Sequence, residues 1–263
     1  MKIKKSIISI LTLSTLLFGV AYAEDAKEKG LRISEETKAR DLGWTDSSAE
    51  LEMILKNQHG ETSIRKMEIK SIEQENDGDK SLNIFQSPND VKGTAFLSFS
   101  HPVGNDDQWL YLPALKRVKR ISSRNKSGSF MGSEFSFEDF VSFEVAKYTY
   151  EYMKDESIDG EDCWVIIQYP VDKYSGYKKR IVWVDKSEYR IRKTDFYDRK
   201  NTLLKTLTFS NFNFLSEKYW RPQKLSMVNH QSGKSTILNF THYVLNQGLS
   251  EKDFNKNALK RAR

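Results

Sequence analysis

The sequence predicts a mainly β protein built on a single antiparallel sheet that is strongly curved or partly closed. Turn signals rich in Gly, Asn, Asp, Ser and Pro recur about every ten residues, and short strand-like segments lie between them. Almost no helical pattern separates these segments. This effectively excludes a parallel α/β fold, because parallel strands need long crossover connections that are usually helical.

The elements follow from the positions of the turns. Ser34, followed by two glutamates, is a helix N-terminal pattern and predicts a short helix over residues 35–42. An S-x-x-D pattern that begins at Ser250 predicts a terminal helix that ends near Lys260. The predicted strands cover residues 49–56, 62–75, 81–86, 94–99, 108–112, 117–122, 147–157, 163–169, 178–184, 189–197, 203–214, 224–230 and 236–245.

These strands differ in how their two faces are composed. Residues 50–56 and 189–197 alternate apolar with charged side chains, which is typical of a half-solvated strand. Residues 163–169 and 180–184 are apolar on both faces, so we expect a helix or a loop to cover their second face. The mixture favours a sheet with an apolar concave face and a solvated convex face.

The first 23 residues have the three parts of a secretory signal peptide. Three lysines among the first five residues form a basic start, a short uncharged run follows, and an A-x-A cleavage site ends at Ala23. The uncharged run is shorter than the roughly twenty residues that a spanning helix needs. We therefore expect residues 1–23 to be removed, residues 24–263 to form one domain, and the mature protein to be periplasmic and not membrane-spanning.

The charge balance of the mature chain is unremarkable for a soluble surface. The full sequence has 42 basic and 36 acidic residues, and loss of the signal peptide leaves 39 basic residues and a net charge of +3. Such a balance gives little reason to expect a nucleic-acid partner. Cys163 is the single cysteine, which excludes an intramolecular disulfide and requires an exported protein to be held by its hydrophobic core. Its apolar neighbours predict a buried thiol rather than a nucleophile.

Aromatic side chains concentrate in two neighbouring strands. Leu97 and Phe99 fall on one face of the strand over residues 94–99, and Trp109 and Tyr111 share a face of the next strand. These four side chains are our candidates for the lining of an apolar cavity. A shift of one residue in the strand face would instead present Phe96 and Ser98, and the sequence does not decide between the two arrangements.

A Gly- and Ser-rich loop over residues 127–140 follows these strands and carries five large apolar side chains: Phe130, Met131, Phe135, Phe137 and Phe140. Water penalises such side chains unless they dock on an apolar surface. One interpretation is a flap over a cavity, which an acyl chain displaces because each buried CH₂ contributes about 0.8 kcal/mol. The alternative is that the loop completes the core permanently.

This part of the chain also resembles a known family. The strand FLSFS, the block DDQWLYLPALKRVKRI and the loop KSGSFMGSEFSFEDF are similar to the LolA-like outer-membrane lipoprotein-sorting proteins, periplasmic carriers that shield acyl chains inside an unclosed β-barrel. The resemblance implies one strongly curved antiparallel sheet that forms an unclosed β-barrel of the LolA/LolB type, with short helices and a loop covering the cavity. It implies a carrier without a cofactor or a catalytic step.

The resemblance also indicates cargo and partners. It implies binding of a lipid or of the acyl chains of a lipoprotein in a hydrophobic cavity, with transfer between envelope membranes or to a transporter. The SFMGSEFSFEDF loop is typical of a subgroup that is associated with resistance-nodulation-type exporters of hydrophobic molecules. An inner-membrane exporter and an outer-membrane acceptor are therefore the expected partners. A glycerolipid or a hopanoid is as admissible a ligand as a lipoprotein.

The residues that could carry catalysis or bind metal are few. None of the four histidines has the spacing of a metal site, and the sequence contains no nucleophile elbow, P-loop or dinucleotide fingerprint. We therefore expect no catalytic and no metal-binding residues. A secreted β-scaffold hydrolase remains the alternative if His101, Asp106 and Asp107 converge. An outer-membrane barrel is a third reading, but the chain ends in a polar, basic segment rather than in a strand.

The densest basic cluster follows the aromatic strands and comprises Arg117, Lys119, Arg120, Arg124 and Lys126. Anionic lipid headgroups or an acidic partner protein match it better than nucleic acid does, because the chain carries an export signal. The alternative is a solvated strand edge on which lysines discourage aggregation.

Overall fold

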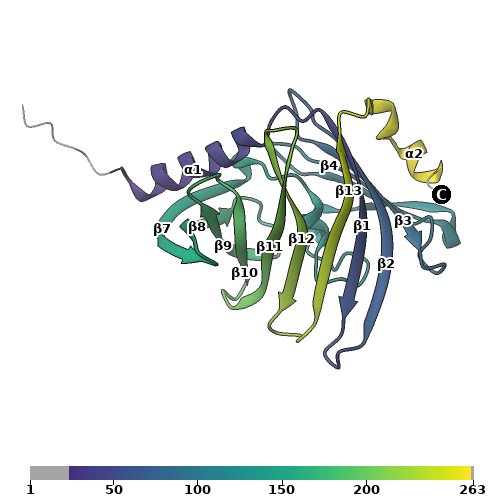
Figure 1. The fold of residues 1–263 in the computed structure, drawn as a ribbon. Helices are drawn as coiled ribbons and strands as arrows, with labels where there is room; N and C mark the ends of the chain where they lie inside the picture. Colours follow the sequence, from purple (N-terminus) through teal and green to yellow (C-terminus); the bar gives the residue numbers. More distant parts are fainter. Residues whose placement is uncertain (1–23, 262–263) are drawn as a thin grey trace, which may run out of the picture.

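Two β-meanders, joined by the pairing of β1 with β13, form a single antiparallel sheet in this computed structural model, which describes residues 24–261 (Figure 1). The strand order is β6-β5-β4-β3-β2-β1-β13-β12-β11-β10-β9-β8-β7, so β6 and β7 are the two free edges. The sheet curves strongly without closing. The predicted fold class, an unclosed antiparallel β-barrel with short helices, is confirmed. The predicted signal peptide lies outside the described residues.

The thirteen strands agree with the predicted segments to within a few residues. They are β1 (Asp46–Lys56), β2 (Thr62–Ile72), β3 (Lys80–Ser87), β4 (Ala95–Phe99), β5 (Asp107–Leu112), β6 (Arg117–Ile121), β7 (Tyr148–Ile158), β8 (Glu161–Pro170), β9 (Tyr177–Asp185), β10 (Ile191–Asp198), β11 (Leu203–Leu215), β12 (Tyr219–Asn229) and β13 (Ser235–Leu245). Turns of a few residues connect most of them. The long connection between β6 and β7 is the exception, and it lies inside the curve of the sheet.

The main hydrophobic core lies on the concave face. Alternate residues of the central strands point into this core. On β1, Leu51 and Met53 point into it, whereas the alternating Glu50 and Glu52 point to the convex face. The buried members of this core are Leu51, Met53, Met67, Phe85, Val91, Phe96, Leu110, Ile121, Phe130, Phe135, Tyr177, Phe196, Leu207, Met227 and Leu238. They come from both meanders and from the β6–β7 connection, so one core holds the two halves of the sheet together.

The N-terminal helix is longer than the sequence pattern predicted. α1 (Ala26–Arg40) begins well before the predicted helix over residues 35–42, and Ser34, the predicted N-cap, lies within it and donates its hydroxyl to the carbonyl of Gly30. Tertiary packing explains the extension. Gly30 sits against the backbone of β7, where an added Cβ would lie 2.9 Å from the amide nitrogen of Tyr152. Because a larger residue would separate the two elements, the glycine allows α1 to pack on this edge of the sheet.

The strands with two apolar faces are covered on the inside by α1. Ile33 of α1 packs on Ile166, Val182 and Val184 of the concave face. The opposite face of the same strands carries a second cluster that includes Cys163, Val165 and Trp183. Long side chains cover this outer cluster: the Lys193 ammonium lies 4.0 Å from the ring centroid of Trp183.

The C-terminal helix covers the outer face at the other end of the sheet. Ser250 and Asp253 form the predicted capping box, but the helix that it caps is the single 3₁₀ turn Glu251–Asp253, and α2 (Lys256–Arg261) follows. Figure 1 shows α2 beside β3 and β4, far from α1. Phe254 and Leu259 of this segment pack on the outer face of β3, β4 and β5. Neither of the described helices is long and apolar enough to cross a membrane.

Candidate ligand-binding site

The phenylalanine-rich loop fills the concave side of the sheet. We call residues 127–140 the plug. Phe130 is 0 % exposed and Phe135 is 3 % exposed, and Met131, Phe137 and Phe140 are partly buried against the same core. The ring of Phe130 lies 4.1 Å from that of Phe140 and 5.2 Å from that of Phe96, centroid to centroid. The loop therefore fills the concave face of the sheet. In this structure it is part of the hydrophobic core, as the second interpretation of the loop expects.

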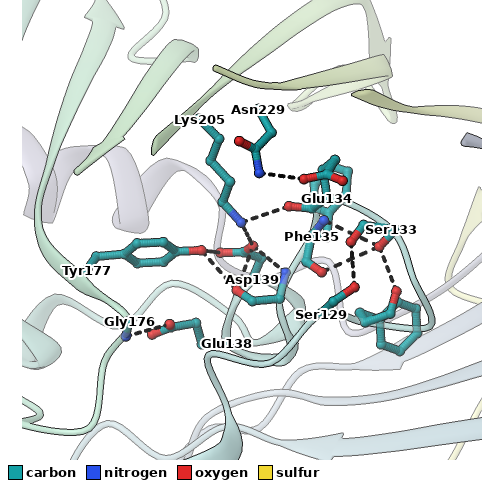
Figure 2. Close-up of polar contacts among 12 residues, drawn as sticks. Ser129, Ser133, Glu134, Phe135, Glu138, Asp139, Gly176, Tyr177, Lys205 and Asn229 are labelled. Carbon is teal, nitrogen blue, oxygen red and sulfur yellow. Dashed lines mark hydrogen bonds and ion pairs between the residues drawn. The ribbon is translucent and has the colours of Figure 1, made fainter. Parts of the chain in front are cut away.

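Buried polar contacts fix the plug to the second meander (Figure 2). The Lys205 ammonium on β11 lies 2.7 Å from Asp139 Oδ2 and donates to the carbonyl of Glu134 at 2.9 Å. The Tyr177 hydroxyl on β9 donates to Asp139 Oδ1 at 2.8 Å. We call Lys205, Asp139 and Tyr177 the latch. Burying an unpaired charge is costly, so each member of the latch requires the others.

Further bonds attach the plug to the first meander. Gln108 on β5 donates its side-chain amide to the carbonyl of Phe137 at 2.8 Å, and Arg65 on β2 donates to the carbonyl of Met131. The plug is thus bonded to strands of both halves. It ties together the parts of a sheet that has no closing strand pair.

Asp139 of the latch and its neighbour Glu138 differ in the sign of their pKa shifts. Burial alone would raise the pKa of Asp139, but the Lys205 ammonium and the hydrogen bonds from Ser136 and Tyr177 outweigh burial and hold the pKa below its usual value. Burial raises the pKa of Glu138, and the adjacent Asp139 charge raises it further, although Gly176 and Ser175 donate hydrogen bonds to it. The strongly stabilised carboxylate of Asp139 therefore lies next to the carboxylate of Glu138, which is less well compensated.

An open cleft of about 520 Å³ remains beside the plug, between the C-terminal end of α1 and strands β10 to β13. We call it the aromatic cleft. Its volume falls within the range of about 300–1,000 Å³ that is common for small-molecule sites. Its aromatic residues are Trp44, Phe143, Tyr189, Phe209, Phe212, Trp220 and Tyr243. Such walls offer a large apolar area to a ligand.

Distant parts of the chain meet at this cleft. α1 and the segment after it contribute one wall, the β9–β10 turn contributes Tyr189, and β11 to β13 contribute the remaining aromatic rings apart from Phe143. Phe143 comes from the segment that leads from the plug to β7. The cleft therefore borders the helix and the segment that follows the plug, and a movement of either would change its shape.

Four of the five cations that line the cleft are paired with carboxylates, and the fifth, Lys218, donates to the carbonyl of Leu42. Arg190 lies 2.6 Å from Asp185, which is fully buried, and its guanidinium lies 4.7 Å from the ring centroid of Trp220. Arg221 pairs with Asp41 at the end of α1. The indole N–H of Trp220 is buried and has no hydrogen-bond partner among the described residues. The walls of the cleft therefore combine aromatic carbon with charged side chains, most of which are paired within the protein.

A larger hollow of about 840 Å³ lies over β1, β2 and β13 on the convex side. Its lining includes Glu50, Glu52, Glu68 and Lys66, and no Phe, Tyr or Trp. Charged side chains hold water, so this hollow is a poor site for an apolar ligand. The aromatic cleft is the better candidate despite its smaller volume.

The structure corrects the expected position of four candidate lining residues: Leu97, Phe99, Trp109 and Tyr111. Leu97 and Trp109 are cross-strand partners on the outer face, where Phe254 and Leu259 bury them, and Phe99 and Tyr111 pack against the same cluster. Phe96 faces the plug instead. Both faces of β4 are apolar because each is covered, one by the plug and the other by the C-terminal segment. Alternation alone could not identify the concave face.

The walls of the aromatic cleft were not predicted from the sequence. Phe209, Phe212 and Trp220 come from a stretch that is unusually aromatic for two paired strands joined by a short turn. This density of aromatic residues was the feature of the sequence that could have indicated the cleft. Trp44 and Tyr189 lie in turns, and the sequence does not indicate that they meet at the same place.

Comparison with solved structures places the chain in a family. A structure from Vibrio parahaemolyticus that is named as an outer membrane lipoprotein-sorting protein domain is 60% identical, covers 89% of this chain and 100% of its own, and has a TM-score of 0.88. A DUF1329 family protein from Desulfovibrio piger is 30% identical, covers 90% of this chain and 100% of its own, and has a TM-score of 0.85. The chain belongs to the LolA-like family.

Three further comparisons concern this LolA-like chain. A LolA superfamily protein from Nitrosomonas europaea is 23% identical, covers 90% of this chain and 100% of its own, and has a TM-score of 0.70, which shows the shared fold. A family model described as an uncharacterized protein matches residues 77–261. No curated protein matches the chain.

The hydrolase alternative can be compared with the geometry of the LolA-like chain. His101 Nδ1 lies 2.9 Å from Asp77, and its Nε2 lies 3.6 Å from Asp107. Asp106 instead pairs with Lys147. Among the described residues, no hydroxyl or thiol hydrogen-bonds to the His101 ring, so the histidine lacks the nucleophile partner that acyl transfer needs. Within residues 24–261, no group of three or more His, Cys, Asp or Glu side chains is placed to hold a metal ion.

Cys163 of this LolA-like protein is placed as the sequence predicted. Its side chain is fully buried in the outer cluster of β8 and β9. Burial, with a further contribution from the Asp185 charge, raises the pKa of the thiol to about 11. A thiol of this kind is a weak nucleophile at neutral pH.

Proposed function

We propose that this protein is a periplasmic carrier that binds a lipid, or the acyl chains of a lipidated protein, in the aromatic cleft. It would shuttle this cargo between the envelope membranes or deliver it to a transporter, with an inner-membrane exporter and an outer-membrane acceptor as partners. The observation that carries the proposal is an open cleft in a LolA-like sheet that is lined by seven aromatic side chains. Family membership supports the same class of function, since the 60% identical structure is named for lipoprotein sorting.

The energetics suit reversible binding. A chain that buries about ten methylenes gains roughly 8 kcal/mol. Association costs about 4–15 kcal/mol in lost freedom and ordering. The two terms are of similar size, so a carrier of this kind can release its cargo to a better acceptor without a fuel of its own.

Co-purification tests the proposal directly. The mature protein is isolated from its native envelope and extracted with organic solvent, and the extract is analysed by mass spectrometry. Phe212→Asp places a carboxylate in the cleft wall, and we expect it to lose the bound lipid that the wild type carries, because an apolar chain would have to desolvate the new charge.

Val228→Asp is the control. Val228 lies on the neighbouring strand β12, is 45 % exposed and is not part of the cleft lining. We expect it to retain the lipid, and circular dichroism should show that both variants are folded. A wild-type protein without apolar cargo, or equal lipid in the two variants, would remove the support for the cleft as the binding site.

A further inference from the structure

The two free edges of the sheet are treated differently. α1 lies along β7 at the position of Gly30, so that edge is covered by a helix. Within residues 24–261, no strand pairs with the outer side of β6, and α2 contacts β6 only on the outer face of the sheet. The hairpin of β5 and β6 is therefore an exposed corner of the molecule. Uncovered edges of this kind usually carry charged side chains that prevent strand addition.

Positive charge concentrates at this corner. We call it the basic corner and define it by the exposed cations of the β5–β6 hairpin, of the segment that follows it, and of α2 with the turn before it: Lys116, Arg117, Lys119, Arg120, Arg124, Lys252, Lys256, Lys260 and Arg261. Arg120 pairs with Asp107. No carboxylate of the described residues lies within ion-pair distance of the other eight. Unpaired cations gain most from an anionic partner.

Packing brings these two groups of cations together. The Lys256 ammonium lies 4.7 Å from the ring centroid of Trp109 on β5, and Trp109 is the cross-strand partner of Arg120 on β6. Lys256 of α2 and Arg120 of β6 therefore border the same indole on the outer face of the sheet. Arg117 and Lys119 are the cross-strand partners of the inward-facing Leu112 and Leu110, so the edge strand β6 presents cations on both of its faces. The same segments contain three acidic residues, Asp107, Glu251 and Asp253, so the nine cations of the corner exceed them by six. The remaining surface must then be net negative.

An apolar side chain stands at the tip of the hairpin. Leu115 is 63 % exposed and is followed directly by Lys116, which turns the chain in a left-handed conformation. An exposed apolar residue surrounded by cations is the composition of segments that lie at a lipid–water interface, where cations contact headgroups and the apolar group enters the acyl boundary. An acidic protein surface would match the charges but would leave Leu115 without a partner.

We propose that the basic corner docks this protein on a membrane surface that contains anionic lipid, with Leu115 inserted between the headgroups. The acidic remainder of the surface orients the molecule, because it is repelled by the same membrane. Docking does not require an occupied cleft, so it stands or falls independently of the cargo.

Vesicle co-sedimentation of the mature protein tests this docking. The probes are vesicles of phosphatidylcholine alone and vesicles of phosphatidylcholine mixed with phosphatidylglycerol. We expect binding to the mixed vesicles only, and we expect high salt to weaken it, because the Debye length falls to about 3 Å at 1 M salt. Binding to neither kind of vesicle, or equal binding to both, would overturn the proposal. Binding to neither is the outcome expected if the partner of the corner is an acidic protein.

Charge reversals locate the surface. The triple variant Lys116→Glu, Arg117→Glu, Lys119→Glu is expected to bind mixed vesicles roughly 100-fold more weakly than the wild type. Its control, Lys178→Glu, Lys200→Glu, Lys234→Glu, makes the same change in net charge at exposed lysines elsewhere and is expected to bind within a few-fold of the wild type. Equal loss in the two variants would show that net charge, not the corner, determines binding.

Leu115→Ser separates insertion from simple charge attraction. All of these positions are exposed, so none of the changes removes a core contact. We expect the serine variant to bind mixed vesicles about tenfold more weakly at unchanged net charge, since it loses the burial of one large apolar side chain. Unchanged binding would remove Leu115 from the proposal and leave no argument for a membrane over an acidic protein.

Discussion

Replacing Asp139 with alanine is expected to lower the free energy of unfolding by about 3–5 kcal/mol, the loss that follows when one member of a buried ion pair is removed. Lys205 is 3 % exposed, and without Asp139 its ammonium would keep only the carbonyl of Glu134 as a close polar partner among the described residues. Tyr177 would also lose its carboxylate acceptor. Urea denaturation followed by tryptophan fluorescence measures the change.

Two further variants make this result specific to burial. Asp155→Ala removes an exposed pair of similar length, in which Asp155 lies 2.8 Å from the Lys186 ammonium, and should cost about 0–1 kcal/mol. The double variant Asp139→Ala, Lys205→Met removes both buried charges and should recover part of the loss, because no isolated ammonium remains. A loss at Asp139 no larger than that at Asp155 would mean that the latch contributes little to stability.

The pH dependence of the latch provides an independent measurement. The pKa of Asp139 is lower in the folded protein than in the unfolded chain, so the stabilisation is present above the unfolded value of about 3.9 and is lost as pH falls through the folded value. The stability difference between wild type and Asp139→Asn should therefore shrink below about pH 4. Glu138 acts in the opposite direction, because its raised pKa makes its charged form costly at neutral pH. Only the comparison with the variant isolates Asp139.

The positions of the strands along the chain were predictable because turn residues and apolar alternation are local properties of the sequence. The turns at Asp159 and Gly160 and at Gln231 to Gly233 are where the sequence indicated, and each joins strands that pair directly. The faces of β4 and β5 were not predictable in the same way. Phe96 and Leu97 are adjacent and both are fully buried, since two different covering segments lie on opposite sides of the strand. The apolar positions Phe254 and Leu259 were the distant indication that an outer face needed a cover.

The aromatic cleft could not be predicted, because it depends on how far α1 extends and on what the plug leaves open. Each of its rings satisfies the local pattern of a strand or a turn, so none is conspicuous alone. The composition of residues 127–140 indicated that they need an apolar surface, but it did not indicate where in the sheet they lie. Composition says that five large apolar side chains need an apolar surface. Whether that surface is the interior or the rim of the sheet depends on the latch, whose members lie in three separate segments.

Replacing Phe130 with alanine is expected to cost about 3–5 kcal/mol of unfolding free energy, the usual range for a buried phenylalanine. The ring is 0 % exposed and lies within 6.0 Å, centroid to centroid, of Phe85, Phe96 and Phe140. Phe214→Ala, at a half-exposed position on β11, should cost about 1 kcal/mol or less in the same denaturation experiment.

The variant Phe130→Ala also decides between the two interpretations of the plug. If the plug is a permanent part of the core, Phe130→Ala loses stability while the lipid content of the purified protein stays the same, because Phe130 is not part of the cleft wall. If the plug is a flap that cargo displaces, weakening its anchor favours the displaced state, and the variant should carry more lipid at a small cost in stability. The bonds from strands of both meanders to the plug lead us to expect the first outcome. An increase in bound lipid would show instead that the interior behind Phe130 is part of the binding site.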